Sequence, residues 1–239
     1  MTPKYKRILL KLSGEGMAGE SKTGIDMTVV EKLAAEIKRV HETGVQICVV
    51  IGGGNFFRGA KNAGAQMDRS EADQIGMMAT VMNALALKAA LKNMGCAATI
   101  YSGLVMPQVC AVYNFREAIQ SVAAGEVVIF AGGTGCPYFT TDTGAALRAI
   151  EMHCDVIMKA TQVDGVYSAD PRYNADAVRY DEISYDEVIE KKLNVMDMTA
   201  IAMTRDNAMP VMIFAQKEKD AIIKAVCGEV KCTIIKQKG

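Results

Sequence analysis

The stretch VVIFAGGTGCPYFTTDTGAALRA, residues 127–149, has the pattern of a strand, a glycine-rich loop and a helix. Val127–Phe130 are β-favouring residues, and the loop after them ends in three helix-capping types, Thr140, Thr141 and Asp142. Such a unit directs backbone N–H groups and the positive end of a helix dipole toward an anion. No lysine follows the glycines, so this is not the GxxxxGK[ST] phosphate loop. A positive charge for the anion has to come from another part of the chain.

Short apolar runs alternate with longer helical patterns on both sides of this unit. We expect strands at Arg7–Leu12, Gln46–Ile51, Ala97–Tyr101, Val127–Ala131, Val156–Ala160, Val211–Phe214 and Thr233–Ile235. We expect helices at Met27–Thr43, Ser70–Asn93, Phe115–Ala124, Thr143–His153, Ser184–Lys191, Met198–Asn207 and Lys219–Val226. The strands are almost entirely apolar, as in a parallel sheet covered on both faces. The pattern predicts an α/β fold with a parallel sheet between helical layers, and no linker divides residues 1–239 into separate domains.

The composition argues against several functional classes. Lys and Arg together number 27, as do Asp and Glu, so the formal net charge of zero gives no electrostatic basis for binding nucleic acid. The seven cysteines lack CxxC spacing, which favours small buried side chains in a reducing cytosol and suggests no zinc site. The N-terminus has no signal-peptide pattern, and no apolar run is long enough to span a bilayer. We therefore expect a soluble, cytoplasmic protein without a membrane partner or protein-bound metal.

The ends of the strands are the candidate site, because ligands of open parallel sheets bind beyond the carboxyl ends of the strands. Lys11 lies inside the otherwise apolar first strand, just before Ser13 and Gly14. A buried lysine is costly unless a partner holds its charge. Lys11 either supplies the charge that the glycine-rich loop lacks, or extends from an edge strand to water.

Two further motifs each allow a functional and a structural interpretation. IGGGN, residues 51–55, permits close backbone approach to a ligand, and Arg58 nearby suits phosphate oxygens; the alternative is a tight turn. Asp73 lies in the first turn of the helix expected near Ser70. Its carboxylate either accepts hydrogen bonds from ribose hydroxyls or only interacts favourably with the positive end of the helix dipole.

The stretch KATQVDGVYSADPRY, residues 159–173, is a strand end followed by an Asp-Gly and an Asp-Pro turn. Tyr167 is placed to stack on a base and Asp170 to bind a polar edge of a nucleotide. The alternative is a pair of surface turns without a ligand.

Taken together and in order, KRILLKLSGE, VVIGGGNFFRG, AGGTGCPYFTTD, KATQVDGVYSADP and VMDMTA resemble the bacterial uridylate kinases of the amino-acid-kinase superfamily. The resemblance covers essentially the whole chain. It implies a three-layer α/β/α sandwich around a mainly parallel sheet. It also implies the reaction ATP + UMP → ADP + UDP, in pyrimidine nucleotide synthesis, with Mg²⁺ accompanying ATP on a homohexamer.

The resemblance also assigns residues, each by its match to a family motif. The positions implied for ATP are Lys11, Leu12, Ser13, Gly14, Gly54, Arg58, Thr161, Tyr167 and Asp170. The positions implied for UMP are Gly53, Asp73, Thr134, Gly135, Cys136, Pro137, Tyr138, Phe139, Thr140 and Thr141. The segment linked with GTP activation is Gly19, Glu20, Ser21, Lys22, Thr23 and Gly24.

The assignments lead to a mechanism that depends on position and charge. The glycine-rich loop would cradle UMP, while Lys11 and Arg58 bring positive charge to the phosphates. Asp142 would orient Lys11 or a metal-bound water, and Asp197 would do likewise, unless both are plain helix N-caps. Lys11, Arg58 and Asp142 are thus the candidate catalytic residues.

The resemblance also implies regulation, with GTP as an activator and UTP as an inhibitor. Responsive family members hold GTP through arginines and a histidine, where this chain offers Lys88, Lys92 and Glu126. That departure weakens the expectation of GTP activation.

Two other functions fit parts of the sequence. A related kinase acting on a carboxylate or carbamate would need no base-recognition loop, and TGCPYFTTD argues against it. A nucleotide-binding oxoanion-storage protein would bind ATP without turning over UMP.

Overall fold

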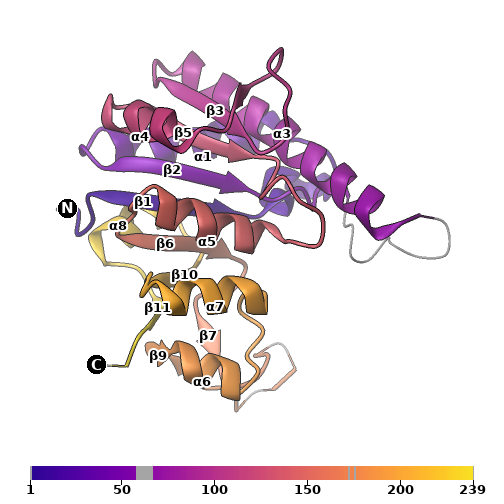
Figure 1. Cartoon of the computed structure of the whole chain (residues 1–239). Coiled ribbons are helices and arrows are strands. Elements are labelled where there is room, and N and C mark those ends of the chain that lie inside the picture. The colour runs from indigo at the N-terminus through magenta and orange to yellow at the C-terminus, as the bar shows by residue number, and fades with distance from the viewer. Residues whose placement is uncertain (1, 58–66, 172, 175, 239) are drawn as a thin grey trace.

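A parallel sheet runs through the computed structural model, which describes residues 2–57, 67–171, 173, 174 and 176–238. In these residues nine strands form one sheet in the order β4-β3-β5-β2-β1-β6-β10-β11-β9 (Figure 1). Their bounds are β1 Arg7–Leu12, β2 Gln46–Ile51, β3 Ala98–Ser102, β4 Ala111–Val112, β5 Val127–Ala131, β6 Val156–Thr161, β9 Glu182–Ser184, β10 Val211–Ala215 and β11 Cys232–Lys236. Neighbouring strands are parallel except β10 and β11. Two short strands, β7 Val166–Tyr167 and β8 Arg179–Tyr180, form a separate antiparallel pair.

Helices cover both faces of the sheet, which gives three layers (Figure 1). One face packs against α1 Met27–His41, α3 Arg69–Asn93 and α8 Ala221–Cys227. The other packs against α4 Phe115–Ala123, α5 Thr141–Glu151, α6 Tyr185–Glu190 and α7 Met198–Asp206. The 3₁₀ turns η1 Gly14–Met17 and η2 Gly19–Ser21 follow β1.

Alternation along the central strands divides the apolar side chains between two cores. On β1, Ile8, Leu10 and Leu12 face the α1/α3/α8 layer, whereas Leu9 faces the α4/α5/α7 layer. All four are fully buried. A strand buried on both faces has to be apolar throughout, which is why Lys11 stands out in the sequence.

The predicted fold class is confirmed, with local differences at the element ends. Most strands and helices lie within two residues of their expected bounds. The helix expected at Thr143–His153 begins two residues earlier, because Thr140 is its N-cap and accepts hydrogen bonds from the backbone N–H groups of Asp142 and Thr143. The short strands β4, β7, β8 and β9 were not expected, because two or three residues carry too little periodicity.

Two of the sequence expectations about the chain as a whole were wrong. Within the described part of the chain, α3 is the one helix long and apolar enough to cross a membrane by length and composition. Half of that apolar stretch is buried, and Thr80 and Asn83 make polar contacts with other elements there, as expected of a core helix in a packed domain. The second error concerns Cys136, which is exposed, whereas Cys48, Cys96, Cys110, Cys154 and Cys227 are buried as expected.

Candidate active site

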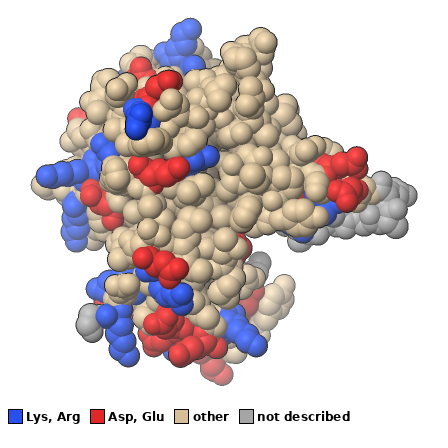
Figure 2. All heavy atoms as spheres, in the orientation of Figure 1, with Lys and Arg blue, Asp and Glu red and all other residues tan. Residues whose placement is uncertain are grey.

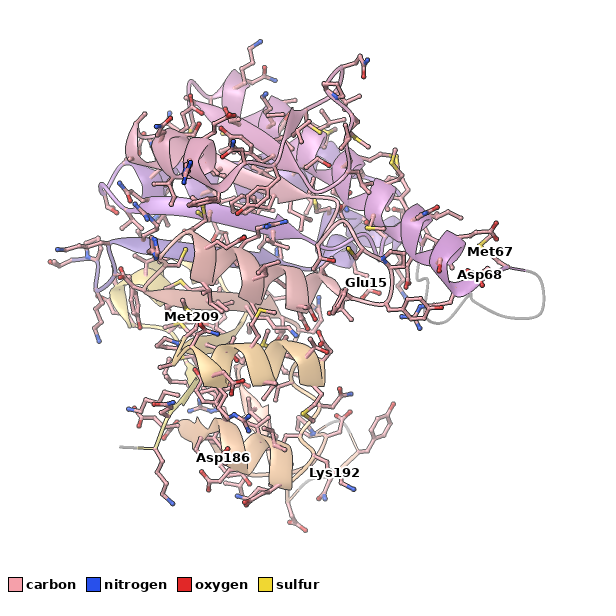
Figure 3. The ribbon with its side chains drawn as sticks, viewed as in Figure 1. Glu15, Met67, Asp68, Asp186, Lys192 and Met209 are labelled. Atoms are coloured by element: carbon pink, nitrogen blue, oxygen red, sulfur yellow. The ribbon has the colours of Figure 1, made fainter. Side chains whose placement is uncertain are left out.

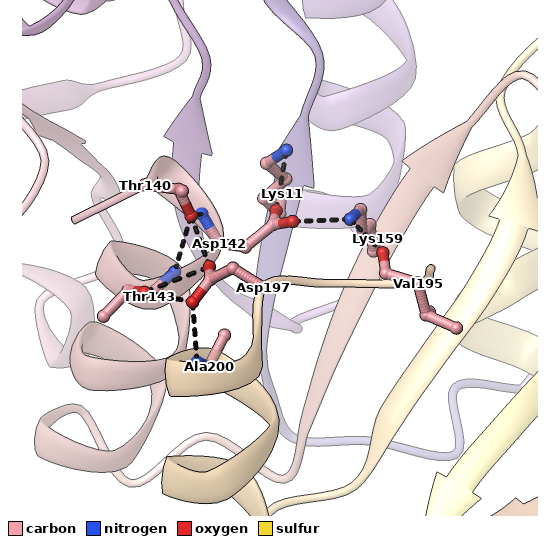
Figure 4. A network of polar contacts seen from close by, with 8 residues as sticks. All are labelled: Lys11, Thr140, Asp142, Thr143, Lys159, Val195, Asp197 and Ala200. Atoms are coloured by element: carbon pink, nitrogen blue, oxygen red, sulfur yellow. Dashed lines mark hydrogen bonds and ion pairs between the residues drawn. The ribbon is translucent and has the colours of Figure 1, made fainter. Parts of the chain in front are cut away.

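A lysine, an aspartate and a second lysine meet where β1, β6 and α5 converge (Figure 4). Lys11 on β1 and Lys159 on β6 are direct partners in the parallel ladder, so their side chains leave the sheet on the same face. Asp142 enters between them from the first turn of α5. The Lys11 Nζ lies 2.8 Å from Asp142 Oδ1, and the Lys159 Nζ lies 2.6 Å from Oδ2. We call Lys11, Asp142 and Lys159 the lysine–aspartate centre.

The lysine–aspartate centre is largely shielded from water. The side chains of Lys11, Asp142 and Lys159 are 12%, 14% and 13% exposed. Burial disfavours the ionised Asp142 carboxyl, but the charges of Lys11 and Lys159 outweigh it and hold its pKa below the ordinary value. Burial lowers the pKa of Lys159, and the nearby Lys11 ammonium adds to that effect against the pull of Asp142. One carboxylate is therefore paired with two lysines.

Asp142 forms an ion pair with Lys11 and is not the N-cap of α5, which is Thr140, whereas Asp197 is the N-cap of α7. Asp197 precedes α7 and accepts from the backbone N–H of Ala200 at 3.0 Å. It also accepts hydrogen bonds from the hydroxyls of Thr140 and Thr143. Asp197 thus fastens the start of α7 to the start of α5 (Figure 4). Its hydrogen bonds reach α5 rather than the lysine–aspartate centre, but its negative charge also acts on Lys159 and opposes the lowering of that pKa.

The first cavity, about 560 Å³, opens beside β6. Its lining includes Lys159 and Thr161 from β6, Tyr167 and Asp170 from the turns after it, and Lys191–Val195 after α6. Thr161 and Tyr167 are held in place, because the Thr161 hydroxyl donates to the Val163 carbonyl at 2.7 Å and the Tyr167 hydroxyl to Asp164 at 2.6 Å. The volume suits a ligand of nucleotide size. Three residues implied for ATP, Thr161, Tyr167 and Asp170, therefore share this cavity.

The second cavity, about 350 Å³, lies between α3 and the glycine-rich loop. Residues implied for UMP form much of its wall: Gly53, Asp73, Thr134, Cys136, Phe139, Thr140 and Thr141. Gly135, Pro137 and Tyr138 do not line it. The lysine–aspartate centre links the two cavities: Lys159 lines the first and is paired with Asp142, whose neighbour Thr141 lines the second, while Lys11 and Asp142 line neither.

Asp73 holds the glycine-rich loop against α3. Its Oδ2 accepts from the Arg69 Nε and from the backbone N–H of Tyr138, each at 2.8 Å. Tyr138 has a φ of 70°, an uncommon conformation for a non-glycine residue, and the Arg69 guanidinium stands 5.5 Å from its ring centroid. Asp68 caps α3 (Figure 3), so Asp73 lies in the second turn. The expectation of a first-turn position, and the dipole explanation with it, was wrong.

The remaining sequence-predicted residues lie around the end of β1. Leu12 and Gly14 are buried there, and Ser13 precedes η1. Gly54 belongs to the turn after β2 and lines none of the three cavities described here. Arg58 lies outside the described residues. In the Gly19–Gly24 segment, Gly19 and Lys22 line a third cavity of about 570 Å³, together with Glu15, Gly16, Gln162, Gln216 and Lys217.

Sequence reasoning missed Lys159, although the same signal that singled out Lys11 was present. Lys159 is a charged residue within the apolar strand Val156–Thr161. The register that sets it opposite Lys11 cannot be derived from either strand alone. Two buried lysines on adjacent strands need a shared carboxylate, and Asp142 is that partner.

The chemistry available here is charge stabilisation. Two ammonium groups and the N-terminus of α5 present positive charge between two cavities. In the described part of the chain, no cluster of three or more His, Cys, Asp or Glu side chains could hold a metal ion. Asp142 is paired with both lysines, although its Oδ1 accepts no hydrogen bond among the described residues, and Asp197 accepts from two threonines and a backbone N–H. A divalent ion would fit here as a companion of a ligand's phosphates.

Known proteins resemble the chain over its whole length. Residues 6–215 match the model of the amino acid kinase family. A uridylate kinase of Paramagnetospirillum magneticum is 50% identical over 232 residues, which is 97% of each chain. The crystal structure of UMP kinase from Ureaplasma parvum superposes with a TM-score of 0.93 at 33% identity, over 98% of this chain and 100% of that one. The UMP kinase of Bacillus anthracis gives a TM-score of 0.93 at 34% identity, over 98% and 97% of the two chains.

Proposed function

The chain belongs to the amino acid kinase family, and from that premise we infer that it is a UMP kinase, an enzyme of pyrimidine nucleotide synthesis that transfers the γ-phosphoryl group of ATP to UMP. The observation that carries the inference is the lysine–aspartate centre between two cavities, one bordered by residues implied for ATP and the other by residues implied for UMP. Two substrates held on either side of fixed positive charge are what direct in-line transfer requires.

In this proposal ATP occupies the first cavity, with its base near Tyr167 and Asp170 and its phosphates toward Lys11. Leu12, Ser13, Gly14, Gly54 and Arg58 complete the proposed ATP site. Lys11 and Lys159 stabilise charge on the transferring group, Asp142 keeps both ammonium groups in place, and Arg58 adds a further charge.

UMP occupies the second cavity, with its ribose at Asp73 and its phosphate toward Thr141 and the N-terminus of α5. Gly53 and the loop from Thr134 to Thr140 form the rest of the proposed UMP site. The phosphate of UMP has a second pKa of about 6, so its oxygen is already ionised at neutral pH and needs no general base.

We propose that Mg²⁺ binds together with ATP. The ion prefers phosphate oxygens, water and one or two carboxylates. Bound there, it would neutralise charge on the ATP phosphates, with Asp142 as the carboxylate that the lysine–aspartate centre would offer it.

A coupled assay of ADP release tests the proposed function. Release is expected to depend on UMP and to remain at background with acetate, glutamate or carbamate. Acceptor-independent release, or release that a carboxylate stimulates instead of UMP, would overturn it in favour of the alternatives.

Replacement of Asp73 by asparagine is expected to raise the KM for UMP about 10- to 100-fold, because a carboxylate holds ribose hydroxyls and the loop more strongly than an amide. The Kd for ATP serves as the internal control and is expected to stay unchanged. Steady-state kinetics with varied UMP measures the KM, and a binding titration measures the Kd for ATP. Equal losses for ATP and UMP would mean that Asp73 is only structural.

We propose further that the enzyme is a homohexamer. The exposed side of α3 carries Ile75, Met78, Met82 and Leu85, which are 39–45% exposed and spaced along one face of the helix. Charged side chains gather mainly at the left and lower parts of the molecule in Figure 2 and leave much of the upper right face uncharged. An exposed apolar stripe of this kind suits a second copy of the chain.

The double variant Met78→Glu/Met82→Glu is expected to shift the assembly to smaller species, because charge at the centre of an apolar contact opposes association. Sedimentation velocity measures the change. Met27→Glu on α1 is the matched control, since Met27 is 43% exposed. A wild-type monomer, or equal dissociation by the control, would contradict the proposal.

GTP is expected to activate weakly or not at all. Glu126 places negative charge where responsive relatives are expected to have an arginine, and its Oε2 accepts from the Thr99 hydroxyl at 2.5 Å. Initial rates across a GTP series measure the response, and a several-fold rise would contradict the expectation. Inhibition by UTP is part of the proposal and is measured in the same way.

The remaining parts of the proposal concern the chain as a whole. We place the protein in the cytoplasm, with ATP and UMP as its ligands and no nucleic-acid or membrane partner. Residues 1–239 are proposed to form a single kinase domain, which the continuous sheet among the described residues supports.

A further inference from the structure

Two buried asparagines form a reciprocal amide pair beneath the glycine turn after β2. The Asn55 Nδ2 donates to Asn83 Oδ1 at 2.9 Å, and the Asn83 Nδ2 donates to Asn55 Oδ1 at 2.8 Å. Asn55 is 2% exposed and Asn83, in the middle of α3, is fully buried. A buried polar pair of this kind is costly unless every donor has a partner.

The second N–H of each amide donates to a backbone carbonyl of another segment. Asn55 donates to the Gly24 carbonyl and Asn83 to the Gly52 carbonyl, each at 2.7 Å. The backbone N–H of Gly24 donates to the Asn55 carbonyl at 3.0 Å. All four amide hydrogens are therefore used, and the pair joins α3, the turn after β2 and the end of the Gly19–Gly24 segment.

The Gly52 carbonyl belongs to the glycine turn that borders the second cavity and packs against Gly14, a residue implied for ATP. Gly53, next to Gly52, lines the second cavity and packs so closely on α3 that an added Cβ would lie 2.6 Å from the Gly76 carbonyl oxygen. Gly14, the first residue of η1, packs against the pair itself, since a Cβ there would lie 2.4 Å from the Gly52 oxygen and 2.6 Å from Asn55 Oδ1. A shift of either amide would therefore move the glycine turn and Gly14 together.

We propose that the Asn55–Asn83 pair positions this glycine backbone for phosphoryl transfer without touching either nucleotide. The pair fixes the turn at residues 52–54 relative to α3 and Gly14, and it fastens the Gly19–Gly24 segment to the same turn. The inference rests on the proposed function, because it assigns the pair a role in that reaction. A misplacement of about 1 Å costs on the order of 100-fold in rate, so the positioning is measurable.

A double-mutant cycle with Asn55→Ala, Asn83→Ala and the double variant tests the proposal. Each single variant is expected to lower kcat about 10- to 100-fold with a smaller change in KM for ATP and UMP. The double variant is expected to lose no more than the single ones, because either substitution already breaks the pair. Thr204→Ala on α7 is the control, since Thr204 is fully buried and its hydroxyl bonds only to carbonyls of its own helix among the described residues.

A variant could also lose activity because it is less stable overall. Hydrogen exchange separates that case from a local change at the glycine turn. The hydrogen-bonded backbone N–H groups of residues 24, 52, 56 and 57 are expected to exchange faster in Asn83→Ala and at the wild-type rate in Thr204→Ala. Additive losses in kcat, an unchanged kcat, or equal losses in the Thr204→Ala control would overturn the positioning role. Wild-type protein that does not phosphorylate UMP would instead refute the proposed function, which separates the two failures.

Discussion

Lys11→Ala is expected to lower kcat about 100-fold or more while the KM for UMP changes little. Charge builds on the transferring phosphoryl group in the transition state, and loss of one fixed donor at such a position typically costs this much. The fold should survive, because Asp142 keeps Lys159 as its partner at 2.6 Å. Steady-state kinetics with circular dichroism as the folding check measures both effects.

Lys11→Met is the matched variant, because it keeps most of the apolar stem and removes only the charge. Its kcat is expected to fall as far as that of Lys11→Ala. A near-normal kcat in either variant would mean that Lys11 serves the packing of the strand and has no part in the chemistry.

Asp142→Asn is expected to affect both activity and stability. It leaves two largely buried ammonium groups side by side without a carboxylate, and removal of one member of a buried ion pair costs about 3–5 kcal/mol. The kcat should fall about 100-fold or more, since Lys11 then loses its ion pair and Lys159 keeps only its hydrogen bond to the Val195 carbonyl. Chemical denaturation and steady-state kinetics on the same preparation measure the two losses.

The double variant Asp142→Asn/Lys159→Met separates stability from catalysis. Removal of the second ammonium group relieves the repulsion, so the free energy of unfolding should recover in part while kcat stays low. Recovery of activity together with stability would show that the lysine–aspartate centre is a structural feature only.

The sheet could be predicted largely from the sequence because its central strands are buried on both faces. Runs such as Arg7–Leu12 and Gln46–Ile51 consist almost wholly of apolar residues, and their bounds match the structure. The strands at the edges of the sheet were harder to predict. β4, with two exposed residues, has no periodic signal, and β9 is only three residues long.

The sequence motifs of the site could be predicted, but the way in which the strands align them could not. Lys11, Asp142 and the loop at residues 134–141 stand out through residue type, since charge or glycine interrupts an apolar pattern. The pairing of Lys11 with Lys159 depends on the alignment of β1 with β6, and the Asn55–Asn83 pair depends on how α3 packs over the glycine turn. Contacts between segments distant in sequence leave no local trace in either one.

The central claim is direct transfer of the phosphoryl group from ATP to UMP at the lysine–aspartate centre. A single turnover with enzyme in excess over ATP carrying ³²P in its γ-phosphoryl group tests it most directly. We predict that the label appears in UDP only when UMP is present, with no labelled protein at any time, and that Lys11→Ala abolishes the fast phase. Label that accumulates on the protein, or that leaves as inorganic phosphate at the same rate with and without UMP, would contradict the account.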